Sequence, residues 1–197
     1  MSIDTPEEGT RARIVDLVEA LIMERGFNAI SYGDVAEQIG IRRASVHYYF
    51  PTKADLGLAV IARYIAKLEA AITPVERLPD AASGVAFENF LGTFASVAAS
   101  AKRVCLGGVL GVEFETLPPA MQAEVRRFYN TAQSWQSARL ERGRVAGAFA
   151  FAGSGEEVAR TIMSTLEGAL IIGRALEEPK QVAMAIASVR RLVGLAG

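Results

Sequence analysis

Residues 26–56 read GFNAISYGDVAEQIGIRRASVHYYFPTKADL, and this stretch carries the strongest local structural signals in the chain. Ser31 is followed three residues later by Asp34, which approximates a capping box and predicts the start of a short helix. Gly40 is expected to end that helix, because glycine tolerates a positive φ. A second short helix is expected over residues 43–49, where the following Phe-Pro pair breaks the pattern. Two short helices joined at a glycine have the dimensions of a helix-turn-helix.

Apolar residues spaced three and four apart recur from end to end, and no segment has the alternation of a strand, so we expect an all-α protein. In the first helix, Ile14, Val18 and Ile22 share one face. We expect about nine helices in two domains: a three-helix helix-turn-helix domain over residues 1–55 and a helical ligand-binding and dimerisation domain over residues 56–197. The next helix is expected at about 53–72, capped by Thr52 and ending before Pro74. The later ones are expected at about 83–101, in a short piece that follows a glycine-rich turn at 107–111, and at 120–142, 154–177 and 179–195.

Composition narrows the possible functions. The 197 residues are 51% hydrophobic with a net charge of -1, which suits a folded chain with a core rather than a disordered one. The single cysteine argues against internal disulfides and cysteine-cluster metal sites, and the single histidine argues against multi-histidine metal sites. The longest charge-free apolar stretch, residues 89–101, is shorter than the roughly 20 residues of a membrane helix. No leader pattern precedes the first helix, so we expect a cytoplasmic protein.

The segment that decides the fold also resembles a known family. The resemblance covers about residues 10–58 in unbroken register and is carried by Gly26-Phe27, residues 31–36 (SYGDVA), Gly40-Ile41, residues 44–50 (ASVHYYF) and residues 53–56 (KADL). These residues resemble the N-terminal domain of the TetR family of transcriptional repressors. The resemblance implies a homodimer that binds a palindromic operator in double-stranded DNA and is released by a small, mostly apolar effector. The rest of the chain matches only in helix number and length.

In a helix-turn-helix, the second helix places its N-terminal side chains in the major groove. Residues 42–53 form a small basic island, which suits a polyanion. The DNA contacts are therefore expected from Ser31, Tyr32, Arg42, Arg43, Ala44, Ser45, His47, Tyr48, Tyr49 and Lys53. Of these, Arg43 is expected at a base edge and Lys53 at a phosphate, although a plain surface lysine is the alternative. The sequence departs from the family twice, with Arg42 where a capping Ser or Thr is common and His47 where tyrosine is common.

Aromatic residues are frequent in the segment 87–140, which suits the wall of a pocket for a mostly apolar molecule. The expected effector-binding residues are Phe90, Phe94, Cys105, Phe114, Phe128 and Trp135. Each aromatic side chain has a core role as its alternative. Cys105 follows two basic residues and is either a reactive thiol that senses electrophiles or a small buried hydrophobe. The helix that begins near Lys53 is expected to connect the pocket to the DNA-binding domain.

The last two helices carry long apolar stripes that we expect to pair across a twofold axis. The expected interface residues are Val158, Ile162, Leu166, Leu170, Ile186 and Val189, and the same stripes include Ile172 and Val193, with Gly168 and Gly173 allowing close approach. In TetR-like proteins the corresponding helices form a four-helix bundle between subunits. The alternative is that both stripes pack within their own subunit.

An enzyme is the competing class of function. An all-α enzyme or small-molecule carrier would use the C-terminal bundle, with the first domain vestigial. The sequence contains no Gly-Lys pair, hence no phosphate-binding loop. Glu113 and Glu115 are two residues apart and point to different faces of a helix, so they do not form an acid–base pair. We therefore expect no catalytic residue, no metal site and no cofactor.

Overall fold

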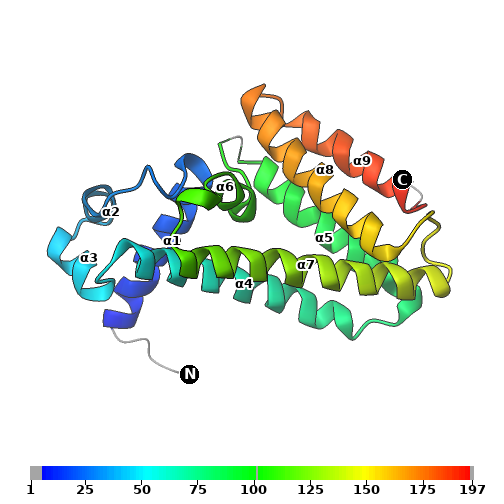
Figure 1. Ribbon diagram of the computed structural model, residues 1–197, viewed down its shortest axis with the longest axis horizontal. Helices are drawn as coiled ribbons and strands as arrows, with labels where there is room; N and C mark the ends of the chain where they lie inside the picture. The colour runs from blue at the N-terminus through cyan, green and yellow to red at the C-terminus, as the bar shows by residue number, and fades with distance from the viewer. Residues whose placement is uncertain (1–5, 101, 196–197) are drawn as a thin grey trace.

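The computed structural model describes residues 6–100 and 102–195, and within them the protein is all-α (Figure 1). The described helices are α1 (Pro6–Arg25), α2 (Tyr32–Ile39), α3 (Arg43–Tyr49), α4 (Lys53–Glu76), α5 (Ser83–Ala98), α6 (Leu106–Val112), α7 (Pro119–Val145), α8 (Gly155–Ala175) and α9 (Lys180–Leu192), with short 3₁₀ turns η1 (Asp80–Ala82) and η2 (Phe114–Thr116). The nine α-helices in the described ranges confirm the expected fold class. The expected helix end at Ala101 and the outer limits of both expected domains lie outside the described residues.

The helix-turn-helix forms as the local signals predict. At α2, the Ser31 side chain and the Asp34 carboxylate cap each other's backbone, and Gly40 ends the helix with φ 76°. Helix α3 begins at Arg42 without any side-chain cap. In its first turn, the Ser45 N–H donates to the Arg42 carbonyl at 2.8 Å. The departure at residue 42 therefore leaves this helix start without the usual side-chain oxygen.

Helix α4 is longer than the sequence predicts. Thr52 and Asp55 form a capping box at its start, and the helix continues to Glu76 with Pro74 inside its last turn. The expected end before Pro74 is wrong, because a proline this close to a helix end removes only one backbone hydrogen bond. Tertiary contacts hold the extension: Val75 is buried, and the Glu76 carboxylate pairs with Arg142 of α7. Because α4 lies on both sides of residue 55, the domain boundary there stays a prediction.

The glycine-rich segment at 107–111 is part of helix α6, not a turn as expected from the sequence. A Cβ on Gly107 would lie 2.5 Å from the Phe128 ring, and one on Gly108 would lie 2.6 Å from a carboxylate oxygen of Glu167. These glycines have no side chain because α7 and α8 approach the α6 backbone too closely for one. Close packing between helices, rather than a turn, explains this glycine cluster.

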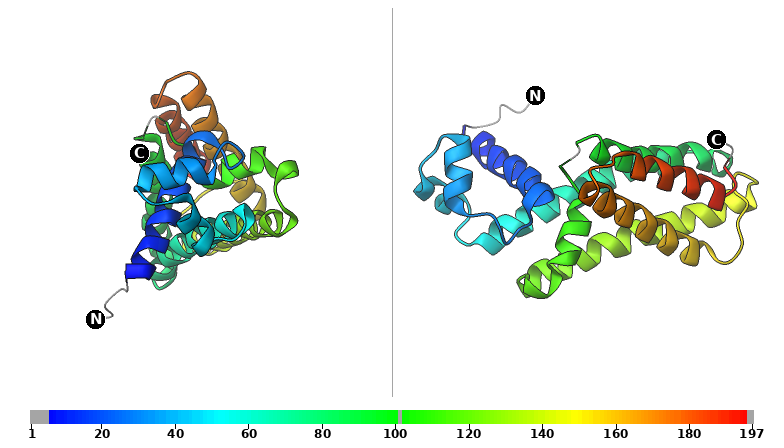
Figure 2. Two further views of the ribbon diagram at one scale, coloured as in Figure 1. Left: turned by 90° about the vertical axis from the view of Figure 1, so that its left-hand side faces the viewer. Right: turned by 90° about the horizontal axis from the view of Figure 1, so that it is seen from above.

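The molecule is elongated, with α2 and α3 at one end and α5, α8 and α9 toward the other, while the long helices α4 and α7 run side by side along it (Figures 1 and 2). Helix α8 packs against α7 on one side and against α9 on the other. A capping box at Ser154 and Glu157 starts α8, as the sequence predicts. None of the described helices combines the length and the apolar character needed to cross a membrane.

Candidate DNA interface and effector cavity

Helix α3 presents one continuous exposed face at the end of the molecule farthest from α9 (Figure 1). Val46 is fully buried and anchors the helix to the core. The expected DNA-contacting residues of this helix and its cap lie on the solvent side: Arg42, Arg43, Ala44, His47 and Tyr48 are exposed, and Ser45 and Tyr49 are half-buried. Tyr48 is the most open aromatic of the group, at 71% exposure, which favours a contact outside the subunit.

Ser31 and Tyr32, the two expected DNA contacts at the start of α2, do not belong to this exposed face. Tyr32 is buried, and its hydroxyl donates to the Phe50 carbonyl at 2.7 Å, so the prediction of a DNA contact there is wrong. Burial also raises the pKa of the Tyr32 hydroxyl, followed by a smaller effect of Asp55. The His47 ring packs edge-on against Tyr32, with 4.4 Å between ring centroids. Tyr32 thus supports the base of the recognition helix, while the exposed Ser31 caps α2 with its hydroxyl.

Lys53 lies at the start of α4 but is held against the DNA-binding domain itself. Its Nζ donates to the Asn28 carbonyl at 3.2 Å and sits 4.6 Å from the centre of the Phe27 ring. Partial burial lowers the pKa of the Lys53 ammonium, although the Glu113 carboxylate opposes this. The ammonium therefore tightens the α1–α2 loop, and any phosphate contact adds to that role.

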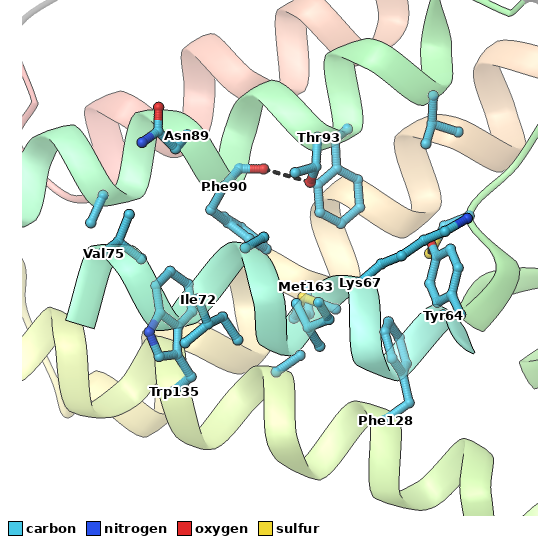
Figure 3. A pocket seen from close by; sticks show the side chains of 17 residues that line it. Tyr64, Lys67, Ile72, Val75, Asn89, Phe90, Thr93, Phe128, Trp135 and Met163 are labelled. Carbon is cyan, nitrogen blue, oxygen red and sulfur yellow. Dashed lines mark hydrogen bonds between the residues drawn. The ribbon is translucent and has the colours of Figure 1, made fainter. Parts of the chain in front are cut away.

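A cavity of about 240 Å³ lies between α4, α5 and α7, and α8 contributes one residue to its wall (Figure 3). The wall is mostly apolar, and the Thr93 hydroxyl is already used, because it donates to the Phe90 carbonyl. Figure 3 shows Trp135 and Ile72 at one end, and Tyr64 and Phe128 at the other. The lining residues are Tyr64, Lys67, Leu68, Ala71, Ile72, Val75, Ala86, Asn89, Phe90, Thr93, Phe94, Val97, Cys105, Phe128, Ala132, Trp135 and Met163.

Five of the six expected effector residues, Phe90, Phe94, Cys105, Phe128 and Trp135, line this cavity. The exception is Phe114, which lies in η2 with the Arg126 guanidinium stacked 4.6 Å from its ring centre. Phe114 therefore does not contribute to the wall of this cavity. Tyr64 and Met163 also line the cavity but were not predicted, because apolar or aromatic residues on α4 and α8 have the pattern of ordinary core positions.

The Tyr64 end of the cavity contains a buried cluster of ionisable groups. The Tyr64 hydroxyl lies 3.4 Å from the Cys105 sulfur. Burial raises the pKa of the Cys105 thiol, and the neighbouring Glu167 carboxylate raises it further. The Arg103 side chain pairs with Glu24 instead of approaching the thiol. A neutral, buried thiol is therefore the form that this environment stabilises, which favours the packing role of Cys105 over the reactive one.

A carboxylate connects the end of α6 to the DNA-binding domain. Glu113 accepts the backbone N–H of Phe27 at 2.7 Å and that of Asn28 at 3.2 Å. The Asn28 side-chain amide donates to the Thr116 hydroxyl at 2.7 Å. Since α6 follows directly after the cavity residue Cys105, one short helix links the cavity to the α1–α2 loop. No local pattern in the sequence indicates this contact, because its partners lie about 86 residues apart.

Comparison with known proteins assigns this architecture. Residues 14–60 match the model of the bacterial regulatory proteins of the tetR family. Two solved regulators resemble the chain over nearly its whole length. The TetR-family regulator from Agrobacterium tumefaciens is 27% identical with a TM-score of 0.87, covering 95% of this chain and 99% of that one. The TetR regulator from Legionella pneumophila is 27% identical with a TM-score of 0.82, covering 98% and 100%.

This chain is a TetR-family transcriptional regulator. It is therefore a DNA-binding regulator and not an enzyme. It is also 27% identical over 128 residues to the transcriptional regulator AcuR of Cereibacter sphaeroides, a match that covers 58% of this chain. The chain spans about half, 52%, of the length of that curated relative.

In this TetR-family regulator the expected dimer residues lie within the subunit. Val158, Ile162, Leu166, Leu170, Ile186 and Val189 are all buried in the single chain, where α8 packs against α7 and α9. These side chains form the core side of α8 and α9, which favours the alternative that the stripes pack within their own subunit, with Ile172 as the exposed exception. Gly173 likewise serves its own subunit, because a Cβ there would lie 3.1 Å from the Glu178 carbonyl.

The opposite faces of α8 and α9 carry the apolar surface that a single chain leaves open. Ile172 is 48% exposed on α8, and Met184 is 67% exposed on α9. Leu176, just after α8, is also exposed. Gly168, one turn before Ile172, has no neighbouring atom within 4 Å of a Cβ position, so it lies on the same open side.

Proposed function

We propose that this regulator is a repressor that occupies a near-palindromic operator as a homodimer and leaves it when a small, mostly apolar effector binds. The observation that carries the proposal is the position of the cavity. Its wall includes α4, which follows the recognition helix α3 after a three-residue connection, and Cys105, which immediately precedes α6. Both elements reach the DNA-binding domain, so a ligand that reshapes the cavity acts on that domain directly.

The exposed face of α3 supports the DNA-binding part of the proposal. Arg42 and Arg43 begin the helix, and a side chain at this end of a recognition helix enters the major groove. Arginine pairs bidentately with guanine, which is worth about 1–3 kcal/mol of discrimination between bases. A regulator acting on the chromosome of a bacterium would work in the cytoplasm.

The outer face of α8 and α9 supports the homodimer. A twofold axis beside Ile172 and Met184 would bury two exposed apolar side chains and their copies, with the open backbone at Gly168 allowing close approach. Apolar burial contributes roughly 25 cal/mol per Å², so such a surface is costly to leave in water. Two α3 helices fixed in this way would read two half-sites about one DNA turn apart.

The lining of the cavity supports a mostly apolar effector with few polar groups. Phe90, Phe94 and Trp135 make up much of the wall. The Trp135 indole nitrogen is buried without a hydrogen-bond partner among the described residues, and it offers one donor to a ligand. For release, the effector must bind the DNA-incompetent arrangement of the domains more tightly than the competent one.

Selection of genomic DNA fragments by the purified full-length protein tests the proposal. We expect enriched fragments to share a near-palindromic site, and the Arg43→Ala variant to lose the preference for that site. A mobility shift on the selected site then reports release by candidate effectors, with Trp135 fluorescence as the parallel measure of binding. Enrichment of no common site would contradict the repressor function.

A further inference from the structure

The carboxylate of Glu167 is buried without a partner next to the cavity. Glu167 is 8% exposed, and among the described residues neither of its oxygens has a hydrogen-bond partner of regular geometry. It lies on α8, one turn after the cavity residue Met163. A buried carboxylate normally has a paired cation or several donors, because leaving it unpaired costs free energy.

The surroundings of Glu167 connect it to the cavity. It interacts with the Cys105 thiol, and both Cys105 and Tyr64 line the cavity. Burial raises the pKa of the Glu167 carboxyl to about 7, and the thiol only partly opposes this. The third group that faces Glu167 is the Tyr129 hydroxyl. Burial raises the pKa of this hydroxyl, and the Glu167 carboxylate raises it further. All of these neighbours are neutral, so none supplies the missing positive charge.

The backbone of α6 leaves room for the carboxylate. A Cβ on Gly108 would lie 2.6 Å from the Glu167 Oε2 atom. Rings surround the same place: Tyr64 lies 5.5 Å from Phe128, and Phe128 lies 5.2 Å from Tyr129, measured between ring centroids. Aromatic ring faces attract cations. At this site that attraction would add to the attraction of the carboxylate for a cation. This end of the cavity therefore combines an unpaired acid with aromatic walls.

No basic side chain competes for this acid. The one basic residue in the described wall of the cavity is Lys67, and its Nζ bonds both carboxylate oxygens of Glu19 on α1. The buried guanidinium of Arg139 donates instead to the carbonyls of Leu78 and Pro79. A ligand with a negative charge would meet Glu167 without compensation, whereas a positive charge would find its complement.

We propose that the effector is a small apolar amine whose protonated amino group occupies the Tyr64 end of the cavity and pairs with Glu167. The apolar part then extends toward Trp135. Access requires the Tyr64 hydroxyl to move away from the Cys105 sulfur, which lies 3.4 Å from it. Both groups are neutral, so breaking this contact leaves no charge unpaired. The inference rests on the proposed function and names the chemical class that the effector cavity selects.

The test compares three probes that share a phenyl group and differ in the head group: 2-phenylethylamine, 2-phenylethanol and 3-phenylpropanoate. Calorimetry on the full-length protein without DNA is expected to show the amine binding at least about 30-fold more tightly than the alcohol or the acid. In wild type the affinity for the amine should rise about tenfold between pH 6 and pH 8, as Glu167 ionises. Binding of the alcohol should not change over that range.

The Glu167→Gln variant should lose the preference for the amine, whereas Glu156→Gln, an exposed carboxylate on the same helix, should keep it. Equal affinities for the three probes, no measurable binding of the amine, or an unchanged amine affinity in Glu167→Gln would overturn the inference. The pH dependence in wild type decides the question if the variant does not fold. A mobility shift separates the two proposals. If the amine binds through Glu167 but the protein stays on DNA, release by the effector is refuted and the amine site is not. If the alcohol or the acid releases the protein from DNA, the amine site is refuted and release by an effector is not.

Discussion

The Glu113 carboxylate accepts the backbone N–H of Phe27 at 2.7 Å and so fastens the end of α6 to the loop between α1 and α2. Lys53 contacts the same loop from the first turn of α4, through the Asn28 carbonyl. Helix α4 lines the cavity, and α6 begins directly after the cavity residue Cys105, so two elements next to the cavity hold the helix-turn-helix domain. This arrangement defines where mutations should separate DNA binding from effector response.

Replacing Glu113 by alanine should weaken that connection. The Phe27 and Asn28 amides lose a charged acceptor, which is expected to lower the free energy of unfolding by about 1–3 kcal/mol. The variant should still bind operator DNA but respond less to effector, because α6 no longer transmits its movement. Denaturant unfolding and effector titration of the DNA complex measure the two effects. The exposed neighbour Glu115, replaced by alanine, is the matched control. An unaltered effector response in Glu113→Ala would rule out this route.

Arg43→Ala and Lys53→Ala should affect DNA binding differently. Arg43 is exposed on α3, and its loss is expected to relax base preference at one position of each half-site. Lys53→Ala should weaken binding to all sequences about equally and reduce the salt dependence. Because Lys53 also packs on Phe27, its variant should unfold somewhat more easily as well. Affinities for a set of operator variants at two salt concentrations distinguish the roles. A uniform loss for Arg43→Ala would make it a phosphate contact.

Glu167→Gln should stabilise the protein at alkaline pH. The pKa of Glu167 is raised from 4.5 to about 7 in the folded state. Protonation thus favours the folded state below the unfolded-state pKa, and this stability is lost as the pH rises through 7. Relative to wild type, the free energy of unfolding of the variant should increase by about 2 kcal/mol between pH 5.5 and pH 8. Chemical denaturation at both pH values measures it, and Glu156→Gln should show no such trend.

Charges on the outer face of α8 and α9 should separate the subunits. Ile172→Arg combined with Met184→Arg is expected to give a folded monomer, since both side chains are largely exposed in the single chain. Leu170→Arg should instead unfold the chain, because Leu170 is 2% exposed and an unpaired arginine cannot be accommodated there. Sedimentation measures the oligomeric state of each variant, and circular dichroism measures whether its helices are retained. A dimer that survives the double substitution would place the interface elsewhere.

Cys105 should react slowly in the native protein. It is buried at 5% exposure with a raised thiol pKa, so both access and the thiolate fraction are low. Iodoacetamide labelling followed by mass spectrometry is expected to require partial opening of the cavity. DNA release by an electrophile should be the same in wild type and in Cys105→Ser. A response confined to wild type would make this cysteine a sensor.

The sequence by itself determined the helices of the N-terminal domain. The signals at Ser31, Gly40 and Thr52 act through hydrogen bonds and φ angles within a few residues, so local chemistry fixes where α2, α3 and α4 begin or end. Their register also carried the family resemblance, and the periodicity of the later helices predicted an all-α fold. These features need no knowledge of what packs against them.

Only the tertiary structure decided which face of each later helix does what. The stripe that includes Leu170 and Ile186 is apolar enough for an interface, yet it packs in the subunit core, and Ile172 and Met184 remain outside. The sequence predicts a turn at Gly107 and Gly108, whereas in the structure residues of α7 and α8 occupy the space that a side chain at either position would need. The pairing of Glu113 with Phe27 and the isolation of Glu167 likewise depend on contacts between distant segments. Helical periodicity reports that a side chain is apolar or charged, but the partner that it meets is set by the packing of helices far apart in the chain.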